Sequence, residues 1–174
     1  MPASFRNLIA LVASLTPLSA PAQVYRPSLA GPRGTELVAV YLTSSWCHGC
    51  RAPEMPTTLD SIKLLLQRQA QEAGQRFRAV FVGMDWAPDS GLALAQEDGA
   101  WDEIIVGRNW LNAGAEHYIW GDTATTPVLP QLILFEQRVE MRARVIFGNR
   151  HVLRRVVGLP ALQEWLRQGV PRAP

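Results

Sequence analysis

Length, composition and charge place this chain among small globular proteins. It has 174 residues, 48% of them hydrophobic and 18% charged, which suits one compact domain with a real core rather than a disordered chain. The formal net charge is only +2, and the basic residues, all arginine except Lys63, do not form one block. So small a charge argues against nucleic acid or an anionic membrane as the partner.

The first 22 residues predict an export signal. Arg6 gives a positive start, residues 8–15 form a short apolar run, and Ala20-Pro21-Ala22 fits the small-x-small cleavage pattern. The apolar run is shorter than the roughly 20 residues that a membrane-spanning helix needs. Cleavage after Ala22 would leave a mature protein in the periplasm. The alternative is an uncleaved segment that anchors the protein to the membrane, facing the periplasm.

The rest of the chain predicts an irregular lead-in, residues 23–35, and one α/β domain, residues 36–170. Its apolar runs and turn residues predict the following elements in chain order: a strand at 37–42, a helix from near Cys47 to Gly74, a strand at 77–84, a short helix at 92–97, a helix at 101–111 with Trp101, Ile104, Ile105 and Leu111 inward, an irregular stretch at 114–126, strands at 131–135 and 139–147 with a turn at 148–149, and a helix at 160–168. Residues 151–157 fit a strand or a helix. The first strand, helix and second strand form a βαβ unit with a right-handed crossover, and Pro53 and Pro56 are expected to disturb its helix.

The two cysteines of the chain, Cys47 and Cys50, follow the first predicted strand and are separated by two residues. A disulfide across so short a loop removes little entropy from the unfolded chain, so reactivity explains the pair better than stability does. At a helix start, the helix dipole and its free N–H groups stabilise a thiolate. We therefore expect Cys47 to be the attacking sulfur and Cys50 the resolving one. His48 either lowers the pKa of Cys47 as a neighbouring cation or only faces water.

Other uses of a cysteine pair fit less well. A structural zinc site needs four ligands, and His117 and His151 lie far away in the sequence without ligand spacing. Covalent haem attachment needs a histidine directly after the second cysteine, where this chain has Arg51. A copper-carrying module that uses both sulfurs stays open as an alternative. So does a redox-inert assembly protein of an exported machine.

Three sequence features together resemble one family. They are Trp46-Cys47-His48-Gly49-Cys50-Arg51 after a strand, Glu54-Met55-Pro56, and Leu129-Pro130 leading into the apolar residues 131–135. This combination resembles the thioredoxin superfamily, and especially its exported bacterial TlpA/ResA-like branch. The resemblance implies a thioredoxin-like fold, with a central mixed sheet flanked by helices and an insertion between the βαβ unit and a strand entered through a cis-proline.

The resemblance also implies a function and a substrate site. It implies thiol-disulfide exchange, more as reductase than as oxidase, on exported cysteine-containing proteins, with a membrane or periplasmic redox partner and no cofactor or metal. The cis-proline would be Pro130 rather than Pro127, because Pro130 would otherwise interrupt the following strand. Leu129 and Pro130 would bind the substrate chain through the backbone, and Trp46 would shape the surface beside the cysteines.

One departure from the family pattern and one separate feature of the chain concern charge. The buried acidic residue of classical thioredoxins would fall at Tyr41, so proton transfer from Cys50 would use Glu54 or water instead. Arginines are enriched late in the chain, which predicts a solvated strand face or, as the second explanation, docking to an acidic partner; they are Arg138, Arg142, Arg144, Arg150, Arg154 and Arg155.

Overall fold

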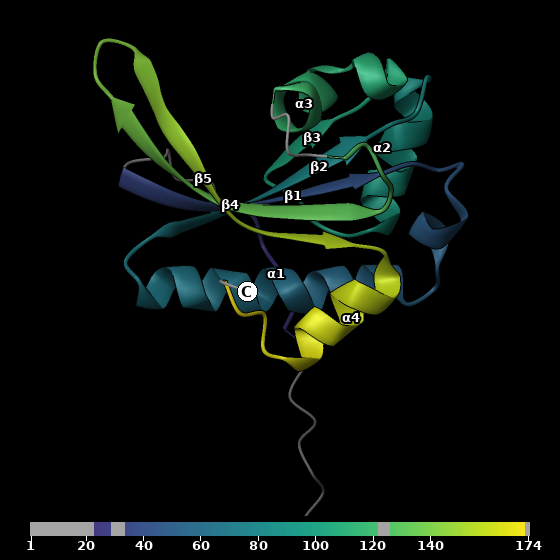
Figure 1. The fold of residues 1–174 in the computed structure, drawn as a ribbon, viewed down its shortest axis with the longest axis horizontal. Coiled ribbons are helices and arrows are strands. Elements are labelled where there is room, and N and C mark those ends of the chain that lie inside the picture. Colours follow the sequence, from purple (N-terminus) through teal and green to yellow (C-terminus); the bar gives the residue numbers. More distant parts are fainter. Residues whose placement is uncertain (1–22, 29–33, 122–125, 173–174) are drawn as a thin grey trace, which may run out of the picture.

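The computed structural model describes residues 23–28, 34–121 and 126–172, and its centre is a five-stranded mixed sheet (Figure 1). The strand order is β3-β2-β1-β4-β5. β1, β2 and β3 run parallel, whereas β4 is antiparallel to both β1 and β5. The strands are β1 Gly34–Thr43, β2 Arg76–Gly83, β3 Glu103–Ile105, β4 Gln131–Met141 and β5 Val145–Val157.

The apolar runs form the middle of this sheet. β1 is buried from Glu36 to its end, and β2 is buried over its last five residues. Both strands are covered on both faces, which explains why their sequences are continuously apolar rather than alternating. β4 completes the buried centre, with Leu132 and Leu134 packed toward one face and Ile133 and Phe135 toward the other.

Helices cover the two faces of the sheet. Side chains of α1 Met55–Glu72, α2 Pro88–Glu97 and α4 Leu159–Arg167 pack in one hydrophobic cluster. The other face carries α3 Ala113–Ala115 and the single-turn π-helix Glu116–Trp120, which continues it. The predicted α/β class, with a central mixed sheet flanked by helices, is confirmed. α2, β3, α3 and the π-helix lie in the chain between β2 and β4.

The prediction that one helix begins near Cys47 is wrong. Residues His48–Arg51 form a short 3-10 helix, and α1 begins only at Met55. Pro53 lies in the break between them, and Pro56 lies in the first turn of α1, where its missing N–H is not needed. The two prolines therefore separate the cysteine turn from α1 instead of distorting a longer helix.

Three further expectations differ from the structure. Residues 101–111 form the edge strand β3 and a 3-10 turn, Asn109–Leu111, instead of a helix. A left-handed backbone at Gly107, Arg108 and Asn109 ends the strand, and Ile104 and Leu111 are exposed rather than inward.

The expected irregular stretch at 114–126 contains α3 and the π-helix, which the buried Ala115 and Ile119 hold against the sheet. The expected turn at 148–149 lies inside β5, because the hairpin turns at residues 142–144.

The described part of the lead-in packs onto the domain. Tyr25 is 1% exposed, meets the ring of Phe77 edge to face, and donates a hydrogen bond from its phenol to the Asp102 carboxylate. Its backbone N–H bonds the side chain of Asp60 in α1, at 3.3 Å. The predicted export signal, residues 1–22, lies outside the described residues. Among those that are described, no helix combines the length and apolar character needed to cross a bilayer.

Candidate active site

The two cysteines form a disulfide at the carboxyl end of β1. Cys47 directly precedes the 3-10 helix His48–Arg51, and the Cys50 N–H bonds the Cys47 carbonyl at 3.0 Å. The Cα atoms are 5.2 Å apart. Cys47 is partly exposed, whereas Cys50 is only 1% exposed. Cys47 thus reaches the surface with part of its area, whereas Cys50 lies inside.

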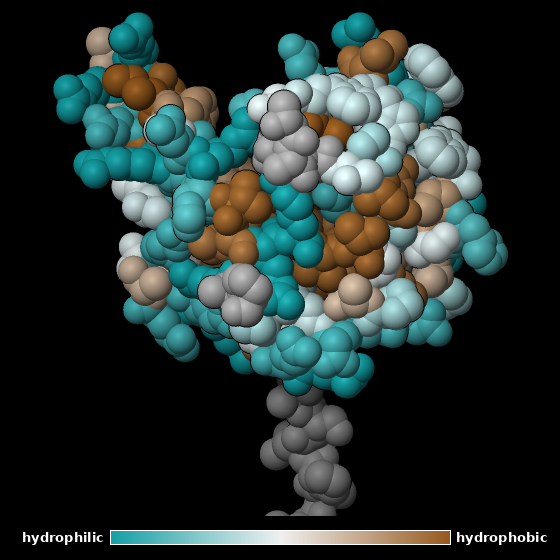
Figure 2. Space-filling model, in the orientation of Figure 1, coloured by the Kyte–Doolittle hydropathy of each residue, from teal (hydrophilic) through white to brown (hydrophobic). Residues whose placement is uncertain are grey.

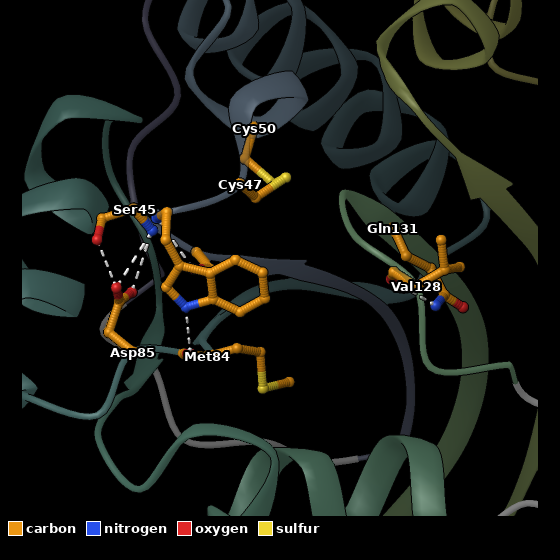
Figure 3. Close-up of a disulfide and its surroundings, with 9 residues drawn as sticks. Ser45, Cys47, Cys50, Met84, Asp85, Val128 and Gln131 are labelled. Carbon is orange, nitrogen blue, oxygen red and sulfur yellow. Dashed lines mark hydrogen bonds between the residues drawn. A yellow bond between two sulfur atoms is a disulfide. The ribbon is translucent and has the colours of Figure 1, made fainter.

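The end of β2 holds the loop that carries Cys47. The carboxylate of Asp85, itself 3% exposed, accepts a hydrogen bond from the Ser45 hydroxyl at 2.5 Å and from the Ser45 N–H at 3.2 Å (Figure 3). The indole N–H of Trp46 donates to the Met84 carbonyl at 3.1 Å. Met84 and Asp85, which follow β2, therefore hold Trp46 and Ser45, the two residues before Cys47.

The loop before β4 lies against the cysteine turn. The Leu129–Pro130 peptide bond is cis. A Cβ placed on Gly49 would lie 3.7 Å from Pro130 Cδ, so this proline is in van der Waals reach of the turn. The buried side chain of Gln131 donates to the carbonyls of Thr126 and Val128, at 3.0 and 3.2 Å. In Figure 3 the Gln131 side chain lies beside Val128, and its hydrogen bond stays within this loop.

The other predicted site residues differ in their exposure and in their place relative to the two cysteines. Trp46 is 59% exposed, directly before Cys47, and Leu129 is partly buried beside Pro130. His48 is exposed in the cysteine turn. Glu54 is exposed directly before α1, and its backbone carbonyl accepts from the Thr57 hydroxyl at 3.0 Å.

A polar cluster lies in the core on the α1 side of the sheet. Tyr41 stacks on Trp101, and burial raises the pKa of its phenol. The Lys63 ammonium lies 4.2 Å from the centre of the Trp101 ring and donates to the Ala100 carbonyl at 2.9 Å. Burial lowers the pKa of Lys63 to about 8 and raises that of Asp98 to about 7. The resemblance expected a buried acid at position 41, where this chain has Tyr41. The buried acid near it is Asp98, which directly follows α2.

From the sequence, Asp85 at the end of a strand could approach the site, although a loop cap was the favoured role, and Gln131 was missed. Asp85 bonds a residue 40 positions earlier, and no local motif announces such a bond. A polar residue at the start of an apolar strand, as in Gln131-Leu132-Ile133, was the one available signal for the other. Within the described ranges, no group of three or more His, Cys, Asp or Glu side chains is placed to hold a metal ion.

Comparisons with known proteins concern the fold. No protein-family model matches the sequence, and no curated protein matches it. Among solved structures, the chain is similar to a thiol-disulfide oxidoreductase from Bacteroides fragilis NCTC 9343, with 18% identity, a TM-score of 0.42, and 76% of this chain and 80% of that chain covered. It is also similar to a secreted thiol-disulfide isomerase from Corynebacterium glutamicum, with 16% identity, a TM-score of 0.36, and coverages of 57% and 54%. A third similar structure is dsbF from MTB, with 14% identity, a TM-score of 0.36, and coverages of 79% and 81%.

Proposed function

We propose that the protein is a thiol-disulfide oxidoreductase in which Cys47 is the nucleophile and Cys50 the resolving cysteine. The observation that carries this proposal is the asymmetry of one disulfide, with Cys47 partly exposed and Cys50 1% exposed. Only the exposed sulfur can meet a protein substrate. The buried sulfur is held one turn away, where it can attack a mixed disulfide formed at Cys47.

The reaction we propose starts from the dithiol form and balances as a two-electron exchange. The Cys47 thiolate attacks one sulfur of a substrate disulfide, forms a mixed disulfide, and releases one substrate thiolate. The Cys50 thiolate then attacks the Cys47 sulfur and releases the second. The substrate disulfide is reduced to two thiols, and the protein is left with its Cys47–Cys50 disulfide. A dithiol partner must return it to the reduced form.

The substrate chain would lie against the loop before β4. Leu129 is partly buried, Pro130 contacts the cysteine turn, and Gln131 fixes the carbonyls of this loop. An extended chain that pairs with the Leu129 backbone would bring its disulfide to Cys47. The exposed indole of Trp46, the residue before Cys47, offers an apolar surface beside it.

Two side chains are proposed to adjust the protonation of the pair. His48 adjoins Cys47 in an exposed turn, where its cationic form would favour the Cys47 thiolate. Glu54 follows the cysteine turn and is the nearest acid after Cys50 in the chain, so it would accept the Cys50 proton directly or through water.

We also propose where the protein works and in which direction. The predicted export signal would place it in the periplasm, free or anchored, with exported cysteine-containing proteins as substrates and a membrane or periplasmic redox partner. The TlpA/ResA-like resemblance favours a reductase. Its reduction potential would then lie nearer to the about −270 mV of a reducing thioredoxin than to the about −120 mV of a strong oxidant.

The test combines turnover with trapping, using the mature protein and insulin as the disulfide substrate. The wild-type protein should reduce insulin with a thiol reductant as electron source. Cys47→Ala should abolish turnover, and Cys50→Ala should accumulate a mixed disulfide between Cys47 and insulin. The proposal is wrong if Cys50→Ala traps nothing. Stoichiometric Cu(I) binding without exchange would indicate the copper-carrying alternative, and a disulfide that resists reduction would indicate the redox-inert one.

A further inference from the structure

We propose that the β4–β5 hairpin, residues 136–157, is a docking arm that binds an acidic, extended segment of a partner protein along the outer edge of β5. The hairpin projects away from the helices that cover the sheet (Figure 1). β1 pairs with β4 only as far as Val139, and the tip beyond it is a two-stranded ribbon.

The first observation is the unpaired edge. β5 is 13 residues long and lies last in the sheet order, so within the described residues only β4 pairs with it. Proteins protect an edge strand by keeping it short, by covering it, or by placing proline, bulges or charged side chains in it. The β4–β5 pairing has two register shifts and β5 carries three arginines, which repel a basic strand but not an acidic one. β5 contains no proline and is more than twice a typical strand length of about 5–6 residues. Its outer N–H and C=O groups are placed to accept a further strand.

The second observation is the exposure of apolar side chains on this arm. Met141 is 51% exposed, Val145 47%, and Phe147 59%. The space-filling view shows hydrophobic and hydrophilic side chains side by side on the projecting tip (Figure 2). Val145 and Phe147 lie on β5, so the side chains of a strand added along its outer edge would cover them, whereas Met141 lies on the neighbouring strand β4.

The third observation is charge. The arm holds six arginines against two glutamates, a net charge of +4, whereas the whole chain has a formal net charge of +2. The remaining residues are therefore net negative, at −2. The positive charge of the protein is thus concentrated on the hairpin whose outer strand, β5, offers the open edge; Arg150, Arg154 and Arg155 lie on that strand. This coincidence specifies an acidic occupant with apolar residues in alternation.

Two other occupants fit these observations less well. A second copy of β5 would bring two arginine-rich strands together, and like charges on neighbouring strands destabilise pairing. An anionic membrane would need the apolar side chains on one face. The consecutive residues Val145 and Ile146, which are 47% and 38% exposed, point to opposite faces of the ribbon.

The arm also leads toward the cysteine site. The carboxyl end of β5 pairs with the start of β4 at Val157 and Gln131, and the Gly158 N–H bonds the Pro130 carbonyl at 2.9 Å. A segment bound along β5 would therefore end beside the loop that faces the disulfide. Binding itself uses no sulfur, so it should be equal with the cysteines oxidised or reduced.

The experiment measures binding of a blocked octapeptide of alternating Glu and Val to the full mature protein. We expect saturable binding that weakens with added salt, and slower hydrogen exchange in the β5 amides of residues 145–157. The same peptide with Lys in place of Glu should not bind. Arg144→Glu should raise the dissociation constant at least threefold, because it reverses one charge on the tip.

Arg167→Glu is the matched control, since it reverses one exposed arginine on α4, away from the arm. It should leave the dissociation constant unchanged. Equal weakening by both variants would overturn the proposal, because only the overall charge would then matter. Absence of binding, or protection away from β5, would also overturn it, as would binding to anionic phospholipid vesicles without binding to the peptide.

Discussion

Asp85 controls the position of Cys47 without touching it. Its buried carboxylate accepts two hydrogen bonds from Ser45, two residues before the cysteine. Hydrogen bonds to a charged group are worth more than those between neutral groups, about 1.5–3 kcal/mol. The loop before Cys47 therefore depends on one carboxylate at the end of β2.

We predict that Asp85→Asn slows thiol-disulfide exchange several-fold, because the amide accepts less strongly and leaves Ser45 less constrained. The measurement is the rate at which the reduced protein reacts with a model disulfide. Asp89→Asn, at an exposed position in α2, is the control and should keep the wild-type rate. Equal rates for Asp85→Asn and wild type would show that the bond does not position the sulfur.

A comparison of Gln131 with Gln137 separates an effect on substrate binding from an effect on stability. Gln131 and Gln137 are both buried in β4, and both amides donate to backbone carbonyls, but only Gln131 holds the loop beside the disulfide. We predict that Gln131→Leu and Gln137→Leu each lower the free energy of unfolding by about 1–3 kcal/mol. Only Gln131→Leu should also raise the KM for insulin. A raised KM in both variants would assign the effect to general loosening of β4.

At the level of elements, α3 is fixed by a close approach to β2. A Cβ on Gly114 would lie 2.4 Å from the Val82 Cγ1, which is closer than atoms can pack. We predict that Gly114→Ala lowers the free energy of unfolding by about 1–3 kcal/mol. Urea denaturation measures this change. The double variant Gly114→Ala/Val82→Ala should lose less than the two single variants together, and strict additivity would contradict the contact.

The elements that sequence patterns predicted well are those whose burial is decided locally. The apolar run of β1 and the helical spacing in α1 each follow from one segment that faces the core. Residues 101–111 misled the prediction because Trp101, Ile104 and Ile105 have helical spacing. In the structure Trp101 packs on Tyr41, while Ile104 lies on an edge strand paired with β2. That pairing depends on a strand more than 20 residues earlier, so the segment alone could not reveal it.

The residues of the site also divide into those that a local sequence motif predicts and those that only the folded structure brings into place. Cys47, Cys50 and Pro130 belong to short motifs, and the structure brings all three together. The carboxylate of Asp85 and the amide of Gln131 act through bonds that depend on the folded arrangement of loops. The start of α1 after the cysteine turn was predicted too early, because the break at Pro53 shifts the helix by several residues.

At the scale of the whole protein, two buried titratable groups, Asp98 and Lys63, make the free energy of unfolding depend on pH. Asp98 has a pKa of about 7, above its ordinary 3.8, so between about pH 4 and 7 the folded chain keeps a proton that the unfolded chain has lost. The free energy of unfolding should therefore fall as the pH rises through this window. Lys63 has a pKa lowered to about 8 from 10.5, so its contribution should rise with pH between about 8 and 10.5.

We predict that Asp98→Asn flattens the fall between pH 4 and 7 by an amount on the order of 4 kcal/mol. Burial also raises the pKa of Glu36, so a smaller slope should remain. Urea denaturation at several pH values measures the slope. Asp89→Asn, at an exposed position in α2, is the control and should keep the wild-type slope. An unchanged slope in Asp98→Asn would show that this carboxyl does not cause the pH dependence of stability.

Alkylation of the reduced, folded protein tests the proposed division of labour between the two sulfurs most directly. Iodoacetamide is added over a range of pH, and the modified cysteine is identified by peptide mapping. Cys47 should react first, with an apparent pKa below the about 8.5 of a free thiol, while Cys50 stays unmodified until the protein unfolds. Faster modification of Cys50, or a Cys47 that reacts like a free thiol, would contradict the account.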